Sequence, residues 1–412
     1  MLWVVCFFNY ADRQAFFAIF PTLKAEFGFN AVQLGLLGSA FAWIYAIGGP
    51  LAGFIGDRAS RKNLILGSCL FWSVTTVLTG VCGGFGQFVT VRALTGLGEC
   101  IYFPATLSLL SDYHGKSTRS FAFSIHQSAV YIGCIGGSCI GACLAEAHGW
   151  RWSFYLFGGA GIALVFVLSK FLREPIRTGN TQDENRSDTI HPLSLSSTLT
   201  AIACNKTAVL LMIVFLGANF VAMIFMTWVP LFLFEKFHLG LAQAGFTGSA
   251  FVNLAAAVSV PFGGRIADAL ARRYAGGRIT TQALGLLGGS IFIVFVGLTG
   301  SLSILIVSIS FFGLFKGLYD ANIFASLYDV VEPRTRATAA GVMNAVGWCG
   351  GALGPVAAGF ATQYGRHGSD MMANMSEAIA LAAVIFALDG LLLIVALSTV
   401  RRDVDAALTC AV

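Results

Sequence analysis

The chain has 412 residues, of which 57% are hydrophobic and only 11% are charged. Soluble domains carry about 25% charged residues, so this composition excludes a soluble globular protein. The net charge of +5 does not indicate a nucleic-acid partner, because the basic residues follow the two sides of a membrane. The ten cysteines include no CxxC pair, and we expect free thiols inside helices and no metal site.

Hydropathy predicts twelve membrane-spanning helices, since about 20 apolar residues are needed to cross a bilayer. The first six are expected near residues 2–22, 34–56, 63–83, 87–111, 120–144 and 150–172. The second six are expected near residues 207–234, 242–266, 279–299, 303–330, 335–362 and 375–400. We therefore predict an all-α membrane protein with two pseudo-symmetric six-helix bundles, at 1–172 and 207–412, joined by a polar linker at 173–206.

The distribution of lysine and arginine predicts the orientation of these spans. Of the 25 Lys and Arg residues, eighteen fall in the segments on the side of the linker and four fall on the other side. The remaining three, Arg13, Arg92 and Lys316, lie within predicted spans. Because cytoplasmic loops carry an excess of basic residues, both termini and the linker are expected to be cytoplasmic.

Two adjacent charges, Asp12 and Arg13, lie in the middle of the first span, and Glu99 lies at a similar depth in the fourth. A charge at bilayer depth costs a few kcal/mol, so such residues are expected to face a cavity or each other. Asp12 and Glu99 are predicted to carry protons, and Arg13 is predicted to bind an anionic solute. The alternatives are a structural Asp12–Arg13 ion pair and a hydrogen bond from Glu99 that links two helices.

A charged turn occurs at matched places in the two halves, which indicates an internal repeat. GFIGDRASRK at 53–62 follows the second span, and GGRIADALARR at 263–273 follows the eighth. An acidic residue at a helix end followed by basic residues can clamp neighbouring helix termini. The residues expected to have gating or structural roles are therefore Asp57, Arg58, Arg61, Asp268 and Arg272, together with Arg92 near the outer end of its span.

Several further polar residues within spans are candidates for contacts with the solute. In the first half they are Tyr45, His126 and Gln127. In the second half they are Asn219, Lys316, Asn322 and Asn344, although Lys316 is one helical turn from Asp320 and the two can simply neutralise each other. Each asparagine alone is more often a hydrogen-bonding link between helices.

The motifs resemble those of the major facilitator superfamily over essentially the whole chain. The resemblance is carried by the charged turn at 53–62 and by RALTGLGE at 92–99. NYADRQ at 9–14, GLGE at 96–99 and GWRWSFYLFGGAGI…FLREP at 149–175 are similar to the anion:cation symporters. The same NYADRQ and GLGE, with SDYHGKSTRS at 111–120, also resemble Spinster-like lysolipid transporters. The fifth span lacks the Gly-Pro pair typical of drug/proton antiporters.

This resemblance implies a proton-coupled symporter that takes up a small organic anion across a bacterial inner membrane. The alternative is a Spinster-like lysolipid transporter, and cavity lining would discriminate the two: Asn and Lys favour a sugar acid, whereas phenylalanine favours a lipid. HGKST at 114–118 lacks the earlier glycine of a phosphate-binding loop, so no ATPase or other enzyme activity is expected. The expected partners are the solute, protons and the lipid bilayer, with no cofactor, no metal, no nucleic acid and a monomeric state.

Overall fold

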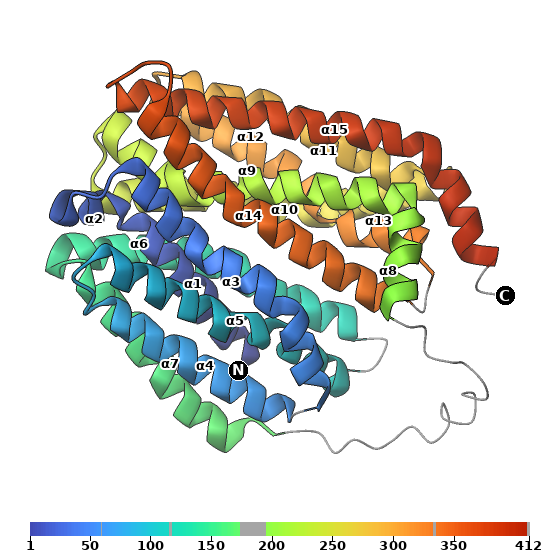
Figure 1. The fold of residues 1–412 in the computed structure, drawn as a ribbon, viewed down its shortest axis with the longest axis horizontal. Helices are drawn as coiled ribbons and strands as arrows, with labels where there is room; N and C mark the ends of the chain where they lie inside the picture. Colours follow the sequence, from blue (N-terminus) through green and yellow to red (C-terminus); the bar gives the residue numbers. More distant parts are fainter. Residues whose placement is uncertain (59, 115–117, 174–194, 333–334, 410–412) are drawn as a thin grey trace.

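The computed structural model describes residues 1–58, 60–114, 118–173, 195–332 and 335–409, and every regular element in these ranges is a helix. The first half contains α1 (Leu2–Ala18), α2 (Phe20–Phe27), α3 (Ala31–Arg58), α4 (Arg61–Thr79), α5 (Phe85–Tyr113), α6 (Arg119–His148) and α7 (Arg151–Phe171). Figure 1 shows these helices as one bundle, beside a second bundle formed by the later part of the chain.

The second bundle begins after the linker region. Its helices are α8 (Leu195–Cys204), α9 (Lys206–Phe237), α10 (Leu241–Ala271), α11 (Gly277–Leu298), α12 (Leu302–Asp320), α13 (Ile323–Val330), α14 (Arg336–Tyr364) and α15 (Met371–Thr409). We call the membrane side at which α7 ends and α9 begins the linker side, and the opposite side the far side.

Twelve of these helices are long, and each coincides with one of the predicted spans. Within the described ranges, nine helices combine the length and the hydropathy that crossing a bilayer requires. The other three, α1, α4 and α14, are shorter or more polar because they carry charged and small residues, such as Asp12 and Arg13 in α1. The predicted all-helical membrane fold is therefore confirmed.

Three details differ from the expected spans. The first span breaks at Ile19, because Pro21 stands at the start of α2 and cannot donate a backbone hydrogen bond to α1. The expected span at 303–330 is divided between α12 and α13 at Ala321 and Asn322. A short additional helix, α8, precedes α9. Most of the predicted linker, residues 174–194, lies outside the described residues.

Small residues set the position of α1, which carries the charged pair. Gly133, Gly137 and Gly141 follow one another at four-residue spacing on α6, and they face Phe7, Ala11 and Ala15 of α1 at the same spacing. A β-carbon on Gly137 would collide with the backbone of Ala11. This close packing of small residues, which is typical of membrane helices, fixes the direction in which the other face of α1 points.

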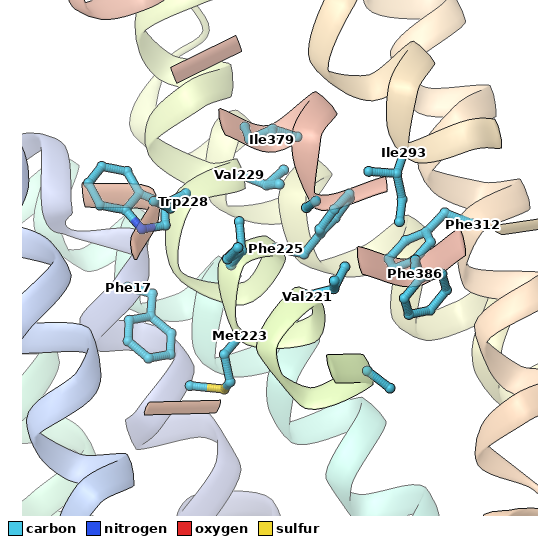
Figure 2. Packing of buried hydrophobic residues seen from close by; sticks show 14 of the residues in the cluster. Phe17, Val221, Met223, Phe225, Trp228, Val229, Ile293, Phe312, Ile379 and Phe386 are labelled. Carbon is cyan, nitrogen blue, oxygen red and sulfur yellow. The ribbon is translucent and has the colours of Figure 1, made fainter. Parts of the chain in front are cut away.

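The second bundle is built around α9, which is hydrophobic on all sides. The rings of Phe225 and Phe312 lie 4.4 Å apart, and Phe312 also contacts Phe386 of α15 at 5.6 Å. Figure 2 shows these rings packed with Val221, Ile293 and other buried apolar residues. This core fixes α12 and α15 around α9, and these helices carry the polar groups of the second half.

The two bundles contact each other closely on the far side. Lys24 of α2 pairs with Glu235 of α9. The backbone of Ala31 donates to Gln363 of α14, and that of Ala242 donates to Glu146 of α6. Towards the linker side, Gly49 of α3 and Gly341 of α14 have open space where a β-carbon would stand. The far side is therefore closed by contacts between the two bundles.

Candidate functional site

The centre of the first bundle holds an ion pair between α1 and α5. The guanidinium of Arg13 donates to the carboxylate of Glu99, which lies at the middle of α5, and also contacts Asn9 Oδ1 at 3.4 Å. Both charged residues are almost completely buried, at 3% and 1% exposure. Glu99 Oε1 and Arg13 Nε have no hydrogen-bond partner among the described residues. The pair therefore keeps unused hydrogen-bonding capacity on both sides.

Four aromatic rings surround the Arg13 guanidinium. Its central carbon lies 4.7 Å from the ring centre of Tyr10, 4.3 Å from that of Phe41, 5.9 Å from that of Tyr45 and 5.4 Å from that of Trp348. A cation over an aromatic face gains about 2 kcal/mol or more when both are shielded from water. Trp348 belongs to α14 and packs against Tyr45 with the ring centres 4.3 Å apart, so the second bundle closes over Arg13.

Asp12 points away from its neighbour Arg13. Its carboxylate accepts a hydrogen bond from Thr76 of α4, and it is 4% exposed. Adjacent side chains on a helix diverge by about 100°, so Asp12 and Arg13 contact different helices. The structural Asp12–Arg13 ion pair, which was one interpretation of the sequence, is replaced by the Arg13–Glu99 pair.

Arg92 completes a group of four buried charges in the first bundle. Its guanidinium lies 4.4 Å from the ring of Phe16 and 5.2 Å from that of Phe41. Its Nε and one terminal nitrogen have no partner in the described part of the chain. Arginine stays protonated in proteins, so Arg92 and Arg13 hold two fixed positive charges. Asp12 and Glu99 are the groups of this cluster whose charge can change.

The second bundle has a small cavity between α9, α12 and α15. The cavity has a volume of about 40 Å³ and is lined by Phe215, Ala218, Asn219, Ala222, Lys316, Tyr319, Asp320 and Phe386. Lys316 pairs with Asp320 one turn later on α12. The second bundle therefore also holds an ion pair at the wall of a cavity.

The other predicted solute-binding residues are spread over the bundle. Tyr45 lies in the aromatic ring around Arg13, and Asn344 is half-buried on α14 one turn from Trp348. His126 is buried near Phe103, at 6.2 Å between ring centres, and Gln127 is exposed. Asn322 bonds the backbone oxygens of Gly263 and Leu318 near the linker side. The structure thus brings Tyr45 to Arg13 but does not bring His126 or Asn322 there.

The predicted charged turns are described in part. The side chains of Asp57 and Arg58 lie outside the described residues. Arg61 pairs with Asp112 at the end of α5, which ties α4 to α5.

In the second half, Asp268 pairs with Arg278 at 2.9 Å, and Arg278 also pairs with Asp329 of α13 at 2.5 Å. Arg272 instead donates to the backbone oxygen of Asp268. The clamp in this half is therefore centred on Arg278, a residue that the sequence analysis did not single out.

Sequence analysis also missed Phe41, Thr76 and Trp348 around the central charges. Phe41 and Trp348 are ordinary aromatic residues in apolar helices, so no local signal marks them. A threonine within an apolar span can bond its own backbone, as Thr76 does to Trp72 at 2.8 Å, and that hides its contact with Asp12. These three residues reach the central charges because of the way their helices pack around α1. Hydropathy does not predict that packing.

Charged residues also close the far side around α2. Partial burial raises the pKa of Glu26, but the hydrogen bonds from Trp150 and Arg151 outweigh it and hold that pKa below its usual value. Glu26 therefore stays ionised at neutral pH and fixes α2 to α7. The neighbouring Lys24–Glu235 pair, at 2.6 Å, connects α2 to the second bundle.

We expect Lys24→Glu to favour opening of the far side, because it places two carboxylates where an ion pair joined the bundles. The shift should be only a few-fold, since an exposed ion pair contributes less than about 1 kcal/mol. Spin labels at Ala25 and Gln243, in a cysteine-free background, would report the distance between the bundles. The double exchange Lys24→Glu/Glu235→Lys should restore closure, and Arg366→Glu, which breaks a pair within the second half, should change nothing. Equal distances in the wild type and all three variants would contradict a role of the Lys24–Glu235 pair in holding the far side closed.

The comparisons with known proteins identify the family. The sequence pattern of the Major Facilitator Superfamily matches residues 2–280 and 242–407 of the chain. The chain belongs to the major facilitator superfamily. It is therefore a multi-pass membrane transporter and not an enzyme, and the resemblance that its motifs indicated is confirmed.

Relatives of both groups that the motifs resembled are found. A probable galactarate/D-glucarate transporter of Escherichia coli (strain K12) is 27% identical over 388 residues, covering 87% of this chain and 85% of that protein. Protein spinster of Drosophila melanogaster is 28% identical over 349 residues, covering 82% of this chain and 57% of that protein.

A solved structure shares the fold. It is a bacterial homologue of the human lysosomal transporter Spinster, crystallised in an inward-facing and occupied conformation. The two folds superpose with a TM-score of 0.83 at 20% identity, covering 98% of this chain and 96% of that one. At this level of identity the likeness supports the fold alone.

Proposed function

We propose that the protein is a proton-coupled symporter of a small organic anion, such as a sugar acid or carboxylate, and that it works by alternating access. The observation that carries the proposal is the Arg13–Glu99 pair, which is buried in the first bundle and lies beneath Trp348 of the second. The fixed positive charge of Arg13 is paired there with the carboxylate of Glu99, which one proton can neutralise. Transporters of this architecture bind their solutes near the bilayer midplane between the two repeats.

The pair couples the proton to the anion through charge balance. When Glu99 takes up a proton, its attraction for Arg13 weakens, and the guanidinium becomes free to grip a carboxylate with two parallel hydrogen bonds. The cluster then contains the same charge as before, because the anion replaces the carboxylate of Glu99. After the anion leaves, Glu99 loses its proton and pairs again with Arg13. Asp12, held by Thr76, is the second candidate proton carrier.

The remaining solute contacts are proposed from both halves. Tyr45, Gln127 and Asn344 would donate or accept hydrogen bonds, whereas His126, which packs near Phe103 and away from Arg13, is a weaker candidate. Asn219 and Lys316 line the cavity of the second bundle. Asn322 is the weakest candidate for a solute contact, because its amide nitrogen already donates to two backbone oxygens. Arg92, Asp57, Arg58, Arg61, Asp268 and Arg272 are proposed to have gating or structural roles.

The cavity lining supports the anion over a lipid. Asn219, Lys316 and Asp320 are polar or charged, and they share the wall with Phe215 and Phe386. A lysolipid would need a longer apolar surface for its chain, so the Spinster-like function remains the second candidate. The excess of basic residues on the linker side supports an orientation with both termini and the linker in the cytoplasm. The transporter of Escherichia coli among the relatives supports a bacterial inner-membrane location. Function as a monomer completes the proposal.

Uptake by purified protein in liposomes tests the proposal. With an acidic exterior, labelled D-glucarate or another small carboxylate should accumulate, and a protonophore should abolish the accumulation. A fluorescent lysolipid in the same vesicles should not change leaflets faster than in protein-free vesicles. Uptake that ignores the proton gradient would contradict coupling, and lysolipid movement without carboxylate uptake would establish the second candidate.

A further inference from the structure

A proline inside α9 leaves one backbone oxygen of that helix without its usual partner. Pro230 has no backbone N–H, so the carbonyl oxygen of Met226, four residues earlier, receives no hydrogen bond from its own helix. Inside a membrane protein, such an oxygen has to be satisfied by a neighbouring helix or by water, because an unpaired carbonyl is costly there. The group that donates to Met226 is therefore a contact on which the packing of α9 depends.

The donor comes from the first bundle. Gln14 of α1 follows Arg13 directly and is 2% exposed, and its Nε2 atom donates to the backbone oxygen of Met226 at 3.4 Å. Because the partner is an acceptor, the amide nitrogen of Gln14 has to face it, and not the amide oxygen. That amide oxygen has no partner among the described residues. The hydrogen bond of the Gln14 side chain thus joins α1 to α9 across the boundary between the bundles.

A second contact of the same kind joins α3 to α14. The hydroxyl of Ser39, which is 1% exposed, donates to the backbone oxygen of Ala352, three residues before Pro355. A β-carbon on Gly35 of α3 would stand only 2.5 Å from the backbone oxygen of Pro355, so the two helices lie very close here. Both contacts run from a side chain of the first bundle to a backbone oxygen of the second, about one turn before a proline.

The two proline regions form one wall of the second bundle. The indole nitrogen of Trp228 in α9 donates to the backbone oxygen of Pro355 in α14 at 3.1 Å, which holds the two regions together. Gly38 of α3 fits against both, since a β-carbon there would lie 2.9 Å from Thr227 and 3.1 Å from Pro355. Movement of this wall away from the first bundle therefore breaks both contacts.

Both contacts lie between the central charges and the far side. α1 runs towards the far side, and Gln14 comes after Arg13. α3 begins at the far side, and Ser39 precedes Tyr45, whose ring lies near Arg13. Opening of the far side has to separate α1 from α9. The oxygen of Met226 then has no N–H of its own helix to bond, so only water can satisfy it.

We propose that Gln14 is a gating residue of the far side, which holds the bundles together by satisfying the backbone oxygen that Pro230 leaves unpaired. Ser39 supports this contact at the adjacent boundary between α3 and α14. In the closed state the amide of Gln14 replaces the missing helical bond, and in the open state water replaces it. The proposal rests on alternating access as part of the proposed function, but not on the proton or on the identity of the solute.

Spin-label distances across the far side test the gate in the absence of solute. With labels at Ala25 and Gln243, Gln14→Met should raise the ratio of open to closed far side about tenfold, because the closed state then buries an unpartnered oxygen. Pro230→Ala alone should stay closed like the wild type. In the Pro230→Ala background, Gln14→Met should have little effect, because the restored N–H bonds the oxygen of Met226. An equal effect of Gln14→Met in both backgrounds, or no effect in either, would overturn the proposal.

Two further variants separate the gate from a general loss of packing. Gln282→Met removes a buried glutamine that bonds the backbone of Asn322 and the hydroxyl of Ser326 within the second bundle, so it should leave the distance unchanged. Equal opening in this variant would overturn the proposal. Gln14→Asn keeps the amide but shortens its reach, so it should open the far side even if Gln14→Met does not fold, and a wild-type distance would contradict the gate. These distances require no proton gradient, so they stay interpretable if Glu99→Gln still accumulates solute and the coupling scheme fails.

Discussion

Glu99→Gln is expected to abolish gradient-driven accumulation of the organic anion while leaving its exchange across the membrane largely intact. Glutamine keeps the shape of a protonated glutamate and one of its hydrogen-bonding faces, but it cannot release a proton. The pair with Arg13 then never re-forms as an ion pair. Because exchange carries loaded protein in both directions, it does not require the acid to return deprotonated.

The measurement compares two assays in the same proteoliposomes. Accumulation under an inward proton gradient should fall to passive equilibration, and solute counterflow should remain and lose its dependence on pH. Glu377→Gln is the matched control, since this acid lies at the far-side surface with Arg366. Asp12→Asn should impair accumulation similarly if Asp12 shares the coupling. A Glu99→Gln protein that still concentrates solute would show that another ion, or the solute gradient alone, drives transport.

The sequence was sufficient to place the helices and the depth of their charges. Apolar runs of membrane length predicted the span at 207–234, and α9 runs from Lys206 to Phe237. The depth of Asp12 and Glu99 followed from counting along each helix. The helix break at Ile19 was missed because the apolar run continues past it, although Pro21 was a visible signal.

The pairing inside the site could not be predicted, since it depends on how the helices are rotated. Arg13 pairs with Glu99, and not with Asp12, because the close packing of α6 glycines such as Gly137 fixes which face of α1 turns towards α5. Trp348 covers Arg13 only because α14 packs against α3. Periodicity locates polar residues on one helix, but it does not specify the partner helix.

The sequence analysis also did not single out Asp389, which lies at the middle of α15. A single acid stands within the apolar run AVIFALDGLLLIVAL of the last span, and such a residue is a functional candidate by position alone. Its neighbour Gly217 is distant in the sequence and carries no charge to suggest the contact. The structure was needed to show that the acid is buried and that a glycine makes room for it.

Arg13→Lys is expected to weaken binding of the organic anion by about ten- to a hundredfold, although the charge is retained. Hydrogen bonds to charged groups contribute about 1.5–3 kcal/mol each, and each 1.4 kcal/mol is about tenfold in affinity. Lysine lacks the planar fork that holds a carboxylate with two bonds. It also lacks the flat surface that packs against Phe41 and Trp348.

Binding should be measured by calorimetry on purified protein. Arg151→Lys is the control, because Arg151 pairs with Glu26 on the far side, and this variant should bind the anion like the wild type. Arg13→Ala alone is a poor test, because removing one partner of a buried ion pair costs about 3–5 kcal/mol through the charge that is left behind. The double variant Arg13→Ala/Glu99→Gln removes both charges and restores neutrality. It should fold and yet fail to bind the anion, because the fixed positive charge is gone. Wild-type affinity in this double variant would exclude Arg13 as the anchor and would transfer that role to Lys316 or Arg92.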